Sequence, residues 1–96
     1  MRVRWSRLSR EHLVAIREYV RGHDADAAER VRLRIIESVR LLRDLPHVGR
    51  SGRKQTTREF VVPHPPYIIV YSVGTPDEDD LVILGIFHDA QGHRHF

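Results

Sequence analysis

The chain has 96 residues, of which 16 are Lys or Arg, 13 are Asp or Glu and none is cysteine. This length fits one modest hydrophobic core, which excludes an enzyme with a cofactor cleft between two lobes. The lack of cysteine excludes disulfides and thiolate metal sites and fits a reducing compartment. No apolar run follows the arginine-rich residues 1–10, so neither a signal peptide nor a membrane span is expected. We therefore expect a single cytoplasmic domain over residues 1–96.

The N-terminal segment predicts a strand followed by a helix. Val3 and Trp5 alternate with arginines, and this period of two predicts a strand that ends near Ser6. Apolar residues then recur at helical spacing up to a glycine, which predicts a helix over residues 8–21. Ser6 or Ser9 can cap this helix, because a serine oxygen accepts a hydrogen bond from the free N–H groups of the first turn.

A second helix is predicted after Gly22. Asp24 or Asp26 can cap its start, and apolar residues follow at steps of three or four until Pro46. Because only a short break separates two helices of similar pattern, we expect an antiparallel helical hairpin.

The second half of the chain changes to the period of strands. Residues 47–57 hold glycines and basic residues around a lone apolar side chain, which predicts an exposed loop. Runs rich in β-branched and aromatic residues follow at 60–62, 67–73 and 81–87, separated by turn residues, and they predict an antiparallel meander. The acidic run 77–80 lacks the glycine and the glutamate of a calcium loop, so it is expected to be a solvated hairpin tip.

The predicted fold is therefore α+β, in the order β-α-α-β-β-β, with an antiparallel sheet. Both helices carry an apolar stripe, so the hairpin has to cover one face of the sheet. The other face is left for solvent or for a ligand.

Two clusters of residues are candidates for a functional site. The first is a basic loop that carries four cations before the next acid, Glu59: Arg50, Arg53, Lys54 and Arg58. Such a density suits a polyanion, because each neutralised phosphate releases counterions. The alternative is a solvated loop in which Arg58 pairs with the neighbouring strands or with Glu59.

The second cluster is the C-terminal segment, which contains His88, His93 and His95. Histidine titrates near neutral pH, so one beside an arginine could act as a general acid or base. Zinc binding by three imidazoles and a tail without a chemical role are the alternatives. We predict no metal site, because imidazole ligands need a fixed geometry and terminal tails are often mobile. We predict no cofactor, since the sequence has no nucleotide-binding glycine motif.

Six short motifs occur in order along nearly the whole chain. They are Val3-x-Trp5-Ser6, Asp26-Ala27-Ala28-Glu29-Arg30, Leu45-Pro46-x-x-Gly49-Arg50, Thr57-Arg58-Glu59-Phe60-Val61-Val62, Pro66-Tyr67-Ile68-Ile69-Val70-Tyr71 and Ile86-Phe87-His88. Together they resemble the RelE/ParE superfamily of bacterial toxins. The resemblance implies the toxin of a type II toxin-antitoxin module, which a small antitoxin binds and silences.

The superfamily divides into two biochemical classes. RelE-like members cleave mRNA on the ribosome, whereas ParE-like members are described as poisons of DNA gyrase. The Thr57-Arg58-Glu59 motif and the terminal His88 of the last predicted strand resemble the ParE side, and residues 61–66 lack the catalytic arginine of the RNase members. The resemblance thus favours growth arrest through gyrase and replication, as in plasmid stabilisation.

The mRNA interferase alternative would rest on a different set of residues. The chain ends in His95-Phe96, similar to some RNase toxins of the superfamily. In that case Glu59 or His95 would be the base, His93 or His88 the acid, and Arg58 with Arg94 the charge clamp. A further alternative is an inactive binding or scaffold domain that has kept the fold.

The resemblance also implies a hetero-oligomer with the antitoxin. Four arginines of the second predicted helix could meet an acidic antitoxin: Arg30, Arg34, Arg40 and Arg43. The alternative is an ordinary solvated helix face, in which Glu37 relieves the repulsion between Arg34 and Arg40.

Overall fold

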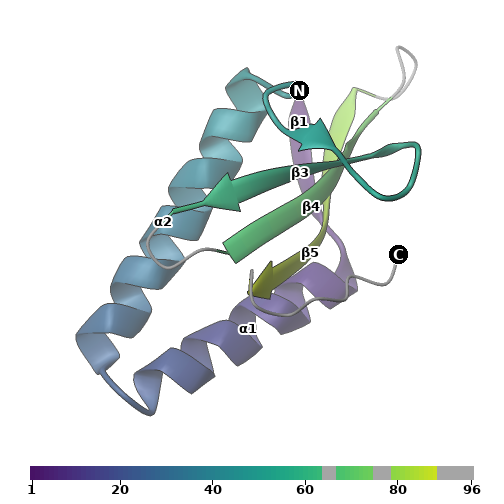
Figure 1. The fold of residues 1–96 in the computed structure, drawn as a ribbon. Coiled ribbons are helices and arrows are strands. Elements are labelled where there is room, and N and C mark those ends of the chain that lie inside the picture. Colours follow the sequence, from purple (N-terminus) through teal and green to yellow (C-terminus); the bar gives the residue numbers. More distant parts are fainter. Residues whose placement is uncertain (64–66, 75–78, 89–96) are drawn as a thin grey trace.

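A helical hairpin lies against one side of a β-sheet in the computed structural model, which describes residues 1–63, 67–74 and 79–88 (Figure 1). In chain order the elements are β1 (Arg2–Trp5), α1 (Arg7–Arg21), α2 (Ala25–Asp44), β2 (Arg50–Ser51), β3 (Thr57–Val62), β4 (Tyr67–Val73) and β5 (Asp80–His88). This arrangement confirms the predicted α+β class and the antiparallel hairpin. Within the described residues, no helix is long and apolar enough to cross a membrane.

Both helices begin where a side chain binds the free N–H groups of the first turn. The Ser6 hydroxyl oxygen accepts a hydrogen bond from the Ser9 N–H at 3.0 Å. An Asp24 carboxylate oxygen accepts from the N–H groups of Asp26 and Ala27 at 2.9 and 3.2 Å. Ser6 and Asp24 are therefore the caps, and the other two candidates lie in the first turns.

The strand order is β1-β5-β4-β3-β2, and the predicted antiparallel meander of β3, β4 and β5 is confirmed. The sheet is mixed rather than fully antiparallel, because β1 pairs with β5 in parallel. The direction follows from the path of the chain (Figure 1): α2 returns to the end of the sheet where β1 begins, and β3 and β4 then run away and back. β5 therefore starts at the same end as β1.

The predicted loop over residues 47–57 contains an additional edge strand. Arg50 and Ser51 of β2 pair with Glu59 and Arg58 of β3, and β3 starts at Thr57 instead of residue 60. The polar residues at these positions carry little strand propensity, so the pairing depends on the turn that joins β2 to β3.

The hydrophobic core lies between the hairpin and one face of the sheet. The helix α2 contributes Val31, Ile35, Val39 and Leu42, and the strands contribute Val62, Tyr67, Ile69, Tyr71, Leu81, Ile83 and Ile86. The second face was expected to be open, but its central side chains are buried. Ile68, Val70 and Glu59 are 0, 2 and 5% exposed, and the register places Glu59 beside Val70 on this face.

Candidate functional site

The loop between α2 and β2 is held by the buried side chain of Tyr71 in β4. The Tyr71 hydroxyl donates to the carbonyl of Pro46 at 2.8 Å and accepts from the N–H of Gly49 at 3.0 Å. Burial raises the pKa of Tyr71, so the hydroxyl keeps its proton. A side chain at Gly49 would overlap the Tyr71 hydroxyl and lie 2.9 Å from the carbonyl oxygen of Glu59. The glycine of the Leu45-Pro46-x-x-Gly49 motif is therefore required for this close approach.

Arg58 of β3 holds the same loop from the neighbouring strand. Its Nη1 group donates to the carbonyl oxygens of Gly49 at 2.8 Å and His47 at 3.2 Å. The side chain is half-buried and lies on the same face as Tyr71, which is its register partner. Arg58 was predicted as a binding cation, and as a catalytic one only in the RNase alternative. Its side chain contacts the loop backbone and not Glu59.

Glu59 points to the opposite face of the sheet. It is 5% exposed and accepts a hydrogen bond from Nη2 of Arg50 at 3.2 Å. The β2–β3 register places these two residues directly opposite each other. The predicted base and one of the four predicted loop cations are thus brought together as an ion pair.

Arg53 and Lys54 lie at the turn between β2 and β3, and both are exposed. The turn is closed by hydrogen bonds from the Gly52 N–H to the Thr57 carbonyl at 2.8 Å and from the Thr57 hydroxyl to the Lys54 carbonyl at 2.8 Å. These contacts fix the turn that presents the two cations at the edge of the sheet (Figure 1).

His88, at the end of β5, makes an edge-to-face contact with Tyr67, with ring centroids 5.3 Å apart. Both residues line a cavity of about 540 Å³ between α1 and β5. The other predicted C-terminal residues, His93, Arg94 and His95, lie outside the described part of the chain. Their predicted roles remain predictions.

His12 of α1 lines the same cavity and was not identified from the sequence. Its Nδ1 accepts a hydrogen bond from the Ile86 N–H at 3.1 Å, and its ring lies edge-on to Phe87 with centroids 4.9 Å apart. Burial lowers the pKa of His12, which keeps Nδ1 free to accept. A lone histidine in an amphipathic helix gives no sequence signal for a contact with a strand so distant in the chain.

The arginines predicted to meet an antitoxin are all exposed on α2: Arg30, Arg34, Arg40 and Arg43. Arg43 forms an ion pair with Asp44 at 3.8 Å, and none of the other three pairs with an acid among the described residues. Arg34 lines a groove of about 410 Å³ between α2 and the end of β3, together with Leu41 and Val62.

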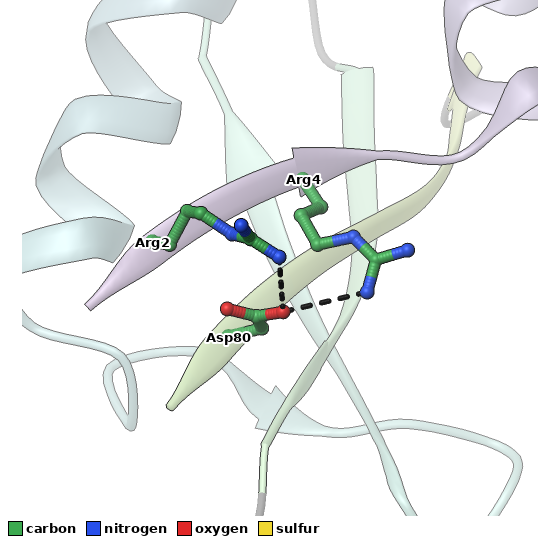
Figure 2. Close-up of polar contacts among 3 residues, drawn as sticks. All are labelled: Arg2, Arg4 and Asp80. Carbon is green, nitrogen blue, oxygen red and sulfur yellow. Dashed lines mark hydrogen bonds and ion pairs between the residues drawn. The ribbon is translucent and has the colours of Figure 1, made fainter. Parts of the chain in front are cut away.

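The described acids of the β4–β5 hairpin are neutralised by the N-terminal strand. Oδ2 of Asp80 accepts hydrogen bonds from Nη2 of Arg2 at 3.1 Å and from Nη1 of Arg4 at 3.4 Å (Figure 2). These contacts, that with Arg2 above all, lower the pKa of Asp80. Asp79 lies 3.5 Å from the N-terminal amine.

Among the residues that the structure describes, no group of three or more acids or histidines could hold a metal ion.

A strand, a helical hairpin and a meander in this order define the small α+β class of RelE/ParE-like domains. The chain belongs to the family described as ParE toxin of type II toxin-antitoxin system, parDE, which matches residues 3–92. It is 39% identical over 90 residues to "Putative toxin Y4kP" from Sinorhizobium fredii, covering 94% of this chain and 90% of that protein.

A solved structure has the same fold. It is described as the chromosomal ParDE TA system from P. aeruginosa, and the match has a TM-score of 0.79 at 23% identity. The alignment covers 92% of this chain and 95% of that chain.

Proposed function

We propose that this chain arrests bacterial growth by inhibiting DNA gyrase and that a cognate antitoxin neutralises it in the cytoplasm. Its membership of the ParE toxin family supports the toxin role. The similar P. aeruginosa structure belongs to a toxin-antitoxin system, which supports an antitoxin partner.

One observation favours gyrase inhibition over mRNA cleavage. A nuclease needs a base and a cation that face the reacting phosphate. Glu59 is 5% exposed and bound to Arg50, whereas Nη1 of Arg58 is bound to two loop carbonyls on the other face. The two residues point away from each other across the sheet, so they do not converge on one phosphate. This arrangement favours a toxin that works by binding rather than by cutting RNA.

Induced expression in a growing culture tests the proposal, with DNA synthesis and protein synthesis followed in parallel. We expect DNA synthesis to stop first, and the purified chain to inhibit supercoiling by gyrase with trapped cleavage complexes. Co-expression of the antitoxin is expected to restore growth. Early loss of translation with mRNA cut at ribosomal A sites would contradict gyrase as the target, and growth without arrest would indicate an inactive scaffold.

A double variant, His93→Ala with His95→Ala, adds a control for the RNase alternative. Unchanged toxicity would exclude the two imidazoles from the mechanism and would contradict the RNase alternative that uses them. Loss of toxicity with a folded protein would instead support a catalytic role for the C-terminal histidines.

We propose the exposed arginines of α2 as the contact surface for the antitoxin. Arg30, Arg34 and Arg40 form no ion pair with a described acid. The adjoining groove, which Glu37 also lines, offers the exposed apolar side chains of Leu41 and Pro63. An acidic segment with apolar residues fits this surface, and such a segment can fold as it binds.

Charge reversal tests this surface. The double variant Arg34→Glu with Arg40→Glu is expected to weaken antitoxin binding in calorimetry by more than tenfold, since each lost charge contact contributes about 1 kcal/mol or more. Arg10→Glu on α1 is the control, because Arg10 is exposed and lies on the other helix. Equal weakening by both variants would contradict a specific role for α2.

A further inference from the structure

A small polar pocket lies at the end of the sheet, beyond the last turn of α2. Its volume is about 220 Å³, and it is bounded by the α2–β2 loop, the β2–β3 turn and the end of β4. The polar residues that line it are His47, Ser51, Gln55, Thr56, Thr57 and Arg58. Among the described residues that line it, none is acidic and none is Phe, Tyr or Trp.

The guanidinium of Arg58 is oriented before any ligand arrives. Its Nη1 group is bound to the carbonyls of His47 and Gly49, whereas Nε and Nη2 make no hydrogen bond to the described residues. A guanidinium has five N–H donors in a fixed plane, so the donors that remain suit an oxygen anion. Because the side chain is half-buried, little rotamer entropy is lost when such an anion binds.

The charges around the pocket favour an anion as well. Residues 47–58 contain four cations and no acid. Glu59, the next acid along the chain, lies on the opposite face with Arg50. Asp44, the acid before this segment, pairs with Arg43 at 3.8 Å. The carboxylate of Asp80 in β5 is bound to Arg2 and Arg4 (Figure 2). These described carboxylates bind other cations, so they do not compensate the positive charge of Arg58 or of the exposed Lys54.

We propose that this pocket binds a phosphate group of a nucleic-acid backbone, with the turn residues Arg53 and Lys54 contacting the adjacent phosphates. No Phe, Tyr or Trp among the described lining residues offers a platform for base stacking, which single-strand binders use. Backbone contacts without base readout suit duplex DNA. This site does not depend on gyrase being the target of the toxin.

Titration with inorganic phosphate tests the pocket directly. In NMR spectra of the amide groups, we expect phosphate to shift Ser51, Thr56 and Arg58, and to leave α1 unchanged. Thr56→Val is expected to reduce these shifts while keeping the loop contacts of Arg58. Shifts spread evenly over the surface, or no shifts at all, would overturn the proposal.

Fluorescence anisotropy with a short labelled duplex DNA tests the nucleic-acid step. Arg58→Gln and Lys54→Gln are each expected to weaken binding about tenfold at low salt and to reduce the slope of log K against log salt by about one. Lys54→Gln keeps the test decisive if Arg58→Gln loses the loop structure. Arg10→Gln, with the same change of charge on α1, is the control, and equal weakening there would overturn the proposal.

A single-stranded RNA of the same length separates the two kinds of nucleic acid. Tighter binding of the RNA than of the duplex would overturn the duplex part of the proposal. The outcome is independent of the gyrase assay, since a chain that binds DNA without inhibiting supercoiling would contradict only the proposed function.

Discussion

Removing the hydroxyl of Tyr71 tests how the α2–β2 loop is held. In Tyr71→Phe, the Pro46 carbonyl loses a donor at 2.8 Å and the buried Gly49 N–H loses an acceptor at 3.0 Å. The two hydrogen bonds contribute about 1 kcal/mol each, and leaving the N–H unpaired adds to this, so we expect a loss of about 2 to 3 kcal/mol in the free energy of unfolding. The ring itself remains, so no cavity is formed beyond the volume of an oxygen atom.

Thermal and urea unfolding measure this loss. For a domain of this size, a loss of about 2 to 3 kcal/mol corresponds to a fall in Tm of about 10 to 20 °C. Tyr19→Phe is the matched control, because Tyr19 is 71% exposed and its hydroxyl makes no hydrogen bond to the described residues. The control should stay within about 0.5 kcal/mol of the natural protein. An equally small effect for Tyr71→Phe would refute the reasoning.

Three further changes test other contacts. Gly49→Ala should lower the free energy of unfolding by about 1 to 3 kcal/mol, because its Cβ has no room. Gly22→Ala should be tolerated in urea unfolding, because its Cβ would lie 3.5 Å from the carbonyl oxygen of Tyr19, an ordinary contact. The pKa of His12 lies below its ordinary value of 6.5, so the unfolded chain takes up the proton first and stability should fall as pH drops below about 6.5. His12→Gln should remove this dependence, and an unchanged pH profile would contradict the contact with Ile86. The contacts with Arg2 and Arg4 lower the pKa of Asp80, so they stabilise the fold at neutral pH and are lost when the carboxylate takes up a proton in acid. Asp80→Asn should therefore lower the free energy of unfolding modestly at pH 7, less at high salt and not at all in strong acid.

Local patterns were sufficient to predict most elements of the fold. The helices followed from apolar spacing between Ser6 and Pro46, and β4 matched its predicted range of 67–73 because its β-branched and aromatic residues are buried on both faces. The two-residue strand β2 could not be predicted, since Arg50 and Ser51 are polar and gain their conformation only from pairing with β3.

The roles of the candidate site residues were harder to predict than the elements. The basic loop was identified, but the sequence could not show that Arg58 is bound to backbone carbonyls or that Glu59 is buried against Arg50. Both contacts depend on strand register. The contact between His12 and Ile86 joins residues 74 positions apart, a separation at which no local pattern carries information.

The parallel pairing of β1 with β5 affects the order in which the chain can fold during synthesis. β1 is synthesised long before its partner β5, which begins at Asp80. Until then the apolar stripe of the hairpin, Val31 and Ile35 included, has no complete sheet to pack against. The domain therefore cannot complete its fold until β5 has left the ribosome, and its toxicity should begin only after that point.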